Sequence, residues 1–129
     1  MSAGGDRTTV LVCLTCRGLA DPLVEPRPGQ QLARATLLAL GDATDICVGG
    51  IRCLGNCARG PSAALRRDRC WTYVFGGLDP VCDGPTLIAG ARLFATSTDG
   101  LLPWRGRPEP LKRGLIARIP PMDFDGEAP

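Results

Sequence analysis

The residues with the clearest capacity for chemistry are cysteines that come in two close pairs. Cys13 and Cys16 form a Cys-x-x-Cys motif, and Cys53 and Cys57 follow with three residues between them. Thiolates are soft ligands that select zinc, cuprous copper or iron-sulfur clusters, and the chain has no histidine to add a nitrogen ligand. Four such thiols that meet at one point would form a sulfur-only metal centre.

Three functions remain open for these cysteines at this stage. The first is a 2Fe-2S cluster that carries electrons, and the second is a zinc- or cobalt-binding module in which four cysteines hold one ion. The third is a thiol-disulfide oxidoreductase that uses Cys13 and Cys16, because a Cys-x-x-Cys motif at the end of a strand also marks a reactive dithiol. In such enzymes the second cysteine sits in the first turn of a helix, whereas residues 17–29 here contain three prolines, which disfavours the third function.

The composition describes one ordinary domain with an unusual number of thiols. The chain has 129 residues, of which 44% are hydrophobic, so a core can form without disulfide staples. The absence of histidine removes the common Ser-His and Cys-His nucleophile arrangements. A net charge of +2 is too small to indicate a nucleic acid as the partner.

The cysteine content also bears on the cellular compartment. The first seven residues lack the apolar core of a signal peptide, and no apolar run in the sequence is long enough to span a membrane. We therefore expect a cytoplasmic protein with no membrane contact. In that reducing compartment, clustered cysteines are more often metal ligands or redox-active thiols than structural disulfides.

The first half of the chain supplies the elements that must position the thiols. Residues 8–14 and 45–52 are rich in β-branched residues and predict two strands, each of which ends next to a cysteine pair. Residues 17–29 predict a loop, and residues 30–40 predict a helix between the strands. If the strands are parallel neighbours, both cysteine pairs emerge at the same edge of the sheet.

The second half of the chain predicts a β-hairpin, a second helix and a tail. Residues 62–66 and 70–75 flank a short polar turn and predict a β-hairpin, and residues 86–97 predict a second helix. The order strand, helix, strand, hairpin, helix indicates an α/β sandwich of the thioredoxin-like type over residues 1–97. Residues 98–129 contain six prolines and predict an irregular basic tail, packed on the domain or docking a partner.

Several motifs carry a resemblance to a known family. They are Cys53-Leu-Gly-Asn-Cys57, Gly60-Pro61 and Trp71-Thr-Tyr73, in that order along the chain. On these motifs the chain resembles the thioredoxin-like 2Fe-2S ferredoxins. The resemblance implies an electron carrier rather than an enzyme, a redox protein as partner, and a homodimer. It also implies that one 2Fe-2S cluster is bound by Cys13, Cys16, Cys53 and Cys57.

A closer resemblance covers the whole chain. It rests on Val-Cys-Leu-Thr-Cys16, Trp71-Thr-Tyr-Val-Phe-Gly76, Gly100-Leu-Leu-Pro-Trp-Arg105 and Ile116-Ala-Arg-Ile-Pro-Pro121, together with the second cysteine pair. These motifs are similar to those of a bacterial family of small, uncharacterised proteins described as predicted metal-binding. Members often accompany cobalamin-synthesis genes, which implies a supporting redox role.

The remaining cysteines and the tail aromatic each have two interpretations. Three further cysteines lie outside the two pairs: Cys47, Cys70 and Cys82. Each is either an ordinary packing residue or a metal ligand in place of one of the four. Trp104 either anchors the tail to the domain or contacts a partner. Arginines beside the cysteine pairs are expected to offset the negative charge of a cluster; they are Arg17, Arg52 and Arg59.

Overall fold

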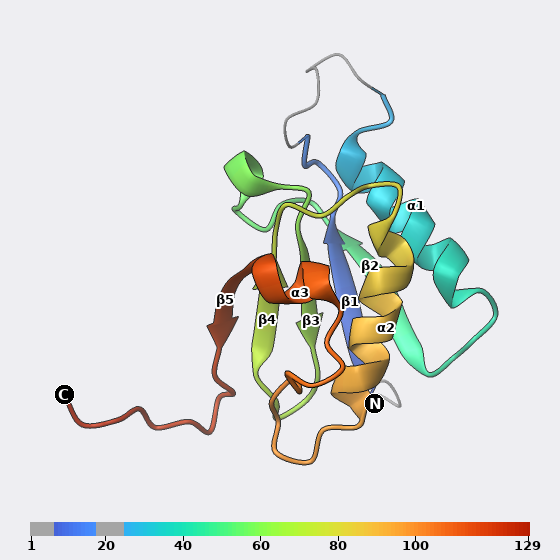
Figure 1. The fold of residues 1–129 in the computed structure, drawn as a ribbon. Coiled ribbons are helices and arrows are strands. Elements are labelled where there is room, and N and C mark those ends of the chain that lie inside the picture. Colours follow the sequence, from blue (N-terminus) through green and yellow to red (C-terminus); the bar gives the residue numbers. More distant parts are fainter. Residues whose placement is uncertain (1–6, 18–24) are drawn as a thin grey trace.

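The computed structural model describes residues 7–17 and 25–129 and shows a mixed five-stranded sheet with helices (Figure 1). Most of the loop predicted for residues 17–29 lies outside the described residues, as does the N-terminal start of the predicted domain. The elements in chain order are β1 (Thr8–Cys13), α1 (Pro28–Leu40), β2 (Ile46–Ile51), the 3-10 turn η1 (Cys57–Arg59), β3 (Ala63–Arg66), β4 (Thr72–Phe75), α2 (Asp83–Ala95), α3 (Glu109–Arg113) and β5 (Leu115–Ile119).

The strand order is β2-β1-β3-β4-β5, with β1 near the middle of the sheet. β1 pairs parallel with β2 and antiparallel with β3, and the β3–β4 and β4–β5 pairs are antiparallel. A parallel pair cannot be joined by a tight turn, and here α1 makes the crossover between β1 and β2. The predicted α/β architecture of thioredoxin-like type is confirmed.

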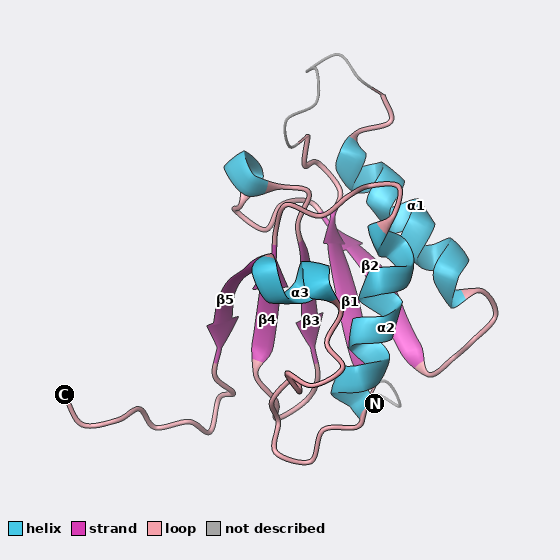
Figure 2. Cartoon of the chain, viewed as in Figure 1, coloured by secondary structure: helices cyan, strands magenta, loops and turns pink. Residues whose placement is uncertain are grey.

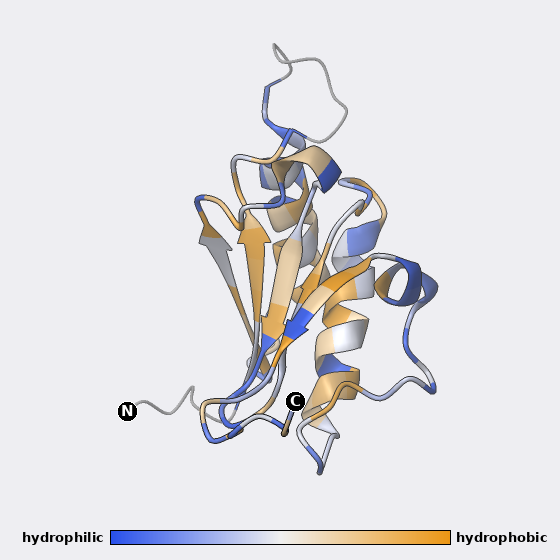
Figure 3. Ribbon diagram, turned by 90° about the vertical axis from the view of Figure 1, so that its left-hand side faces the viewer, coloured by the Kyte–Doolittle hydropathy of each residue, from blue (hydrophilic) through white to orange (hydrophobic). Residues whose placement is uncertain are grey.

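The helices α1 and α2 lie on one face of the sheet, as Figures 2 and 3 show from two directions. Alternate residues of β1 are buried beneath them because successive side chains of a strand point to opposite faces. The fully buried large side chains include Tyr73, Phe75 and Phe94, and the Phe94 ring packs edge-on against Tyr73 with 5.5 Å between centroids. No helix of the described residues is long and apolar enough to span a membrane.

The C-terminal segment is more ordered than its proline content predicts. It contains α3 and then β5, which adds a fifth strand beside β4. The prolines do not prevent this because they lie outside β5, and Pro110 occupies the first turn of α3, where no backbone N–H is required. The expectation of an irregular tail is therefore wrong for residues 109–119.

Specific contacts hold this segment on the domain. The backbone amide of Leu102 donates to the Tyr73 hydroxyl at 2.9 Å, and the buried guanidinium of Arg107 donates to the Leu102 carbonyl at 2.7 Å. Trp104 remains 62% exposed, with Arg107 and Lys112 stacked over its ring at 5.1 and 4.9 Å. Arg107, rather than Trp104, is thus the buried anchor of this part of the tail.

We predict that the segment contributes to stability through Leu111, which is fully buried in the core. Leu111→Ala should lower the free energy of unfolding by about 2–5 kcal/mol, because it leaves a cavity against α2. Urea denaturation followed by circular dichroism measures the change. Leu38→Ala is the matched control, since Leu38 is 83% exposed on α1, and equal effects of the two substitutions would contradict the packing described here.

Candidate metal centre

The parallel pairing of β1 and β2 brings the two cysteine pairs to one edge of the sheet. Cys13, the last residue of β1, is in register with Ile51, the last residue of β2, so the loops that follow leave side by side. The Leu14 amide donates to the Ile51 carbonyl at 2.8 Å, and the Cys13 thiol donates to the Arg52 carbonyl at 3.9 Å. The predicted convergence of the two loops is therefore present.

The first pair is enclosed by protein. Cys13 is fully buried and Cys16 is 1% exposed. Gly29, at the start of α1, donates its amide to the Cys16 carbonyl at 2.9 Å, and a Cβ atom on Gly29 would stand 2.0 Å from the Cys13 carbonyl oxygen. A Cβ atom on Gly60 would stand 2.1 Å from the Cys16 sulfur. Both glycines thus make room for the first pair. The sequence indicates close backbone approach at Gly60, in the Gly60-Pro61 motif, whereas it does not assign Gly29 to the site.

The second pair faces solvent. Cys53 and Cys57 are exposed, and their sulfurs lie 3.7 Å apart. Two thiolates bound to one tetrahedral metal at about 2.3 Å are about 3.8 Å apart, so this pair already has the spacing of ligands to one ion. The Gly55 amide donates to the Cys53 sulfur at 3.2 Å, from a backbone with a φ of 77° that favours glycine.

Asn56 fixes the loop that carries the second pair. Its side-chain amide donates to the Ser62 hydroxyl at 2.9 Å and to the Arg59 carbonyl at 3.5 Å. A Cβ atom on Gly76 would stand 2.5 Å from the same amide nitrogen, so the end of β4 packs closely against the loop. In the sequence, Asn56 stands out only as part of the motif Cys53-Leu-Gly-Asn-Cys57. Its position between two cysteines of a glycine-rich loop is the available signal for an anchoring role.

The thiols differ in their acidity for physical reasons. Burial, followed by a hydrogen bond with Cys13, raises the pKa of Cys16 to about 11. The Gly55 amide, followed by the neighbouring Cys57 thiol, lowers the pKa of Cys53. The pKa of Cys57 is raised by its hydrogen bond with Cys53 and by the charge of that thiol. Cys13 also influences the pKa of Cys16, Cys53 and Cys57, so the two pairs lie close enough to interact.

The four sulfurs nevertheless form two pairs rather than one closed set. Within residues 7–17 and 25–129, no group of three or more cysteine, aspartate or glutamate side chains is gathered tightly enough to hold a metal ion. The donor chemistry and the Cys53–Cys57 spacing fit a thiolate-bound metal. A complete ligand set requires the side chains of the buried pair and the exposed pair to approach one another.

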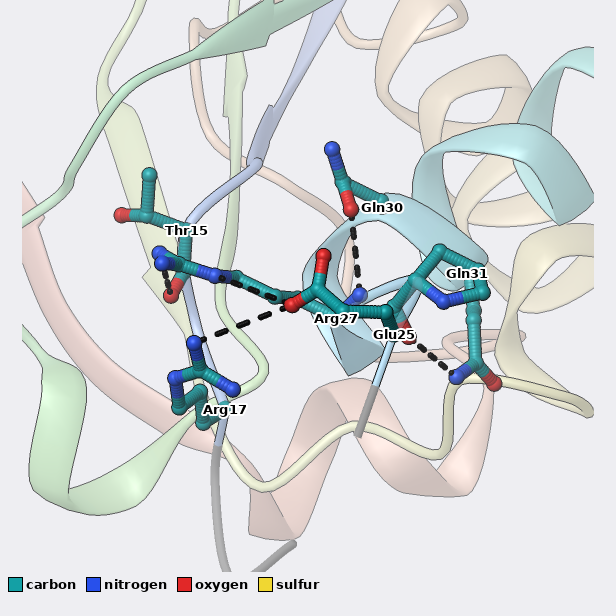
Figure 4. Close-up of polar contacts among 7 residues, drawn as sticks. Thr15, Arg17, Glu25, Arg27, Gln30 and Gln31 are labelled. Atoms are coloured by element: carbon teal, nitrogen blue, oxygen red, sulfur yellow. Dashed lines mark hydrogen bonds and ion pairs between the residues drawn. The ribbon is translucent and has the colours of Figure 1, made fainter. Parts of the chain in front are cut away.

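Polar contacts tie the first cysteine loop to the start of α1 (Figure 4). The Arg27 guanidinium donates to the Thr15 carbonyl at 3.3 Å, and the Arg27 amide donates to Gln30 Oε1 at 3.0 Å. Glu25 lies 3.7 Å from Arg17 and 3.8 Å from Arg27. The Thr15 hydroxyl donates to the carbonyl of Arg52, whose side chain is exposed next to Cys53. Basic side chains therefore border both cysteine loops.

The surplus cysteines lie elsewhere. Cys47, in β2, is in register with Thr9 near the start of β1, and Cys70, in the turn between β3 and β4, packs against the core. Both line a cavity at the end of the sheet away from the four thiols. Cys82 is exposed before α2, and the charge of Asp79 is the main cause that raises its pKa. Cys70 therefore serves as a packing residue, and none of these three cysteines lies beside the four thiols of the two pairs.

Comparison with solved structures places the fold. A thioredoxin-like [2Fe-2S] ferredoxin from Aquifex aeolicus superposes with a TM-score of 0.57 and 17% identity, over 92% of this chain and 99% of that chain. A second structure, of the wild-type ferredoxin from the same organism, gives a TM-score of 0.46 and 18% identity, over 87% of this chain and 98% of that chain. At such identities the likeness shows the fold alone, and it confirms the predicted resemblance to thioredoxin-like ferredoxins.

Comparison of the sequence with known proteins identifies a family but no function. No curated protein matches the chain. A family model described as "Protein of unknown function (DUF1636)" matches residues 10–121, which include all four thiols of the two pairs as well as β5. By this match over most of its length, the chain belongs to that family, and its fold is similar to that of the thioredoxin-like ferredoxins.

Proposed function

We propose that the protein is a small electron carrier that holds one 2Fe-2S cluster through Cys13, Cys16, Cys53 and Cys57. The observation that carries the proposal is the meeting of two cysteine loops at the ends of β1 and β2, in a chain with a ferredoxin-like fold. A bound cluster of this type supplies one-electron chemistry. The protein then needs no substrate of its own, and we assign it no catalytic residue.

The contrast in burial between the two pairs supports this role. Cys13 and Cys16 are enclosed, which protects one side of the centre from water, whereas Cys53 and Cys57 are exposed, which gives a partner short-range access. The Gly55 amide already donates to the Cys53 sulfur, and such hydrogen bonds raise the reduction potential of an iron-sulfur centre. We expect a redox protein in the cytoplasm to dock on this exposed side.

A zinc or cobalt site is the second candidate. The 3.7 Å between Cys53 and Cys57 suits any tetrahedral ion held by thiolates, so the geometry of that pair favours no one metal. Iron, acid-labile sulfide and zinc analysis of protein purified without oxygen separates the candidates. Brown protein with equal iron and sulfide supports the electron carrier, and colourless protein with one zinc per chain contradicts it.

The thiol-disulfide oxidoreductase is disfavoured. A nucleophilic thiol must meet its substrate, yet Cys13 and Cys16 are both buried. Cys16 also does not lie in the first turn of α1, which begins at Pro28. The implied homodimer is part of the same proposal, and light scattering that gives the mass of a single chain would overturn that part alone.

We expect Cys53→Ser to abolish the visible absorption of the cluster and to reduce bound iron severely, because serine oxygen is a poor replacement for a soft thiolate. Absorption spectra and iron analysis of protein purified without oxygen measure the loss. Cys82→Ser is the matched control, since Cys82 is also exposed but lies outside the two pairs, and it should leave both quantities unchanged. A cluster that survives Cys53→Ser would remove Cys53 from the ligand set.

Gly60 offers a test of the buried half of the centre. Gly60→Ala should displace the Cys16 sulfur, because the added Cβ would stand only 2.1 Å from it, and iron content should fall. Gly49→Ala makes the same chemical change in β2, where the new atom meets only Leu11 at 3.5 Å, an ordinary contact. Full iron loading of Gly60→Ala in a folded protein would show that Cys16 does not bind the metal.

Arg52 provides an electrostatic test of the same centre. Reduction adds negative charge, which a neighbouring guanidinium stabilises, so Arg52→Gln should lower the reduction potential by tens of millivolts. Spectroelectrochemical titration measures the potential. Arg69→Gln, in the turn between β3 and β4, is the control and should leave it unchanged. Equal shifts in the two variants would show that the position of the charge does not matter.

A further inference from the structure

A groove of about 1070 Å³ crosses the sheet at the end remote from the four thiols. Each strand contributes a residue to it. Those from β1 to β4 lie next to core residues in their strands, so they point away from α1 and α2. Thr9 is in register with Cys47 on one side and with Arg66 on the other, and Thr72 is in register with Ile119. The groove is thus a continuous row across the face of the sheet opposite α1 and α2.

This groove is separate from the candidate metal centre. Thr9 lies in the groove, whereas Cys13 lies four residues further along β1. At about 3.3 Å per residue, the two positions are about 13 Å apart along the strand. None of the four proposed ligands lines the groove.

The lining of the groove is basic. Two aspartates, Asp68 and Asp123, line the groove together with four arginines. The arginines that line the groove are Arg7, Arg66, Arg67 and Arg69. Positive charge therefore exceeds negative charge here, which favours an anionic ligand.

The arginines divide into two kinds. Arg67 donates to the carbonyls of Phe94 and Ser97, and Arg7 donates to the Thr44 carbonyl, so these two are engaged by the backbone. Arg66 and Arg69 are exposed and form no ion pair with any residue in the ranges 7–17 and 25–129. These two guanidiniums remain available to an anionic partner.

One wall of the groove is apolar and held in place. It is formed by Ile119, the last residue of β5, which is 54% exposed, and by the chain that follows β5, where the Met122 side chain is fully exposed. Two residues further on, the Phe124 ring packs edge-on against Trp71 with 5.7 Å between centroids, and Arg118 lies over the same Trp71 ring at 4.6 Å. The groove therefore offers apolar contact beside positive charge.

The exposure and length of the groove suit an extended polypeptide better than a small molecule. Small-molecule sites bury most of their ligand, but here the wall and both free arginines are exposed to solvent. Five strands about 4.8 Å apart give a row about 19 Å long, which matches about six residues of an extended polypeptide. A second copy of this chain is disfavoured in a symmetric contact, because it would place one basic groove against another.

We propose that the groove binds an extended acidic segment of a partner protein. The carboxylates of the segment pair with Arg66 and Arg69, since a guanidinium binds a carboxylate through two parallel hydrogen bonds. Its apolar residues lie against Ile119 and Met122. The site does not depend on which metal the four thiols hold, because it lies at the other end of the sheet.

A fluorescein-labelled peptide, Glu-Glu-Leu-Glu-Glu-Leu, tests the proposal with the full-length protein. Fluorescence anisotropy should show saturable binding that weakens as salt rises, and the same peptide with Gln in place of Glu should not bind. The double substitution Arg66→Glu and Arg69→Glu should weaken binding roughly tenfold or more. Arg34→Glu, on the exposed part of α1, should have no effect. Amide NMR shifts should change at Thr9, Cys47 and Thr72.

Three results would overturn the proposal. The first is no binding at millimolar peptide, and the second is binding that Arg34→Glu weakens as much as the double substitution does. The third is displacement of the peptide by ATP at concentrations below that of the peptide, which would assign the groove to a small organic phosphate. Circular dichroism confirms that each variant folds, and Arg66→Gln, which removes charge without reversing it, should show a smaller loss in the same direction.

Discussion

The parallel pairing of β1 with β2 is the constraint on which the rest of the structure depends. It sets Cys13 beside Ile51, so two cysteine pairs that are far apart in the sequence leave the sheet at adjacent points. It also requires a crossover, which α1 supplies, and the crossover returns Gly29 to the first cysteine loop. Had these strands been joined by a tight antiparallel hairpin, the two pairs would emerge at opposite ends of the sheet.

The elements could be predicted from the sequence because local signals agree with the final contacts. β-branched runs indicated the strands, and apolar periodicity indicated the helices. Both helices begin earlier than the sequence predicts. α1 begins at Pro28 because proline suits a first helical turn. α2 begins at Asp83, whose carboxylate accepts a hydrogen bond from the Asp79 amide at 2.7 Å. The sequence does not predict β5, because the proline content of residues 98–129 indicates irregular structure, although no proline lies within the strand.

The candidate site could be predicted only in part, for a physical reason. Residue type and strand order were enough to place the two cysteine pairs together. Several features that shape the site come from close approaches between elements distant in sequence, such as Gly29 against the Cys13 carbonyl and Gly76 against Asn56. No spacing rule encodes these contacts, because a glycine that makes room for a neighbour looks the same in sequence as one that only turns the chain. The difference in burial between the two pairs arises in the same way.

The sheet separates two surfaces of different chemistry and keeps them at a fixed distance. β1 runs from Thr9 in the basic groove to Cys13 at the thiols, and it is paired with strands on both sides, so it cannot stretch or bend independently. A partner segment in the groove would therefore leave Cys53 and Cys57 open to solvent, because they are exposed and follow Ile51, where β2 ends beside Cys13. Such an arrangement would let a carrier be held at one end while it exchanges electrons at the other.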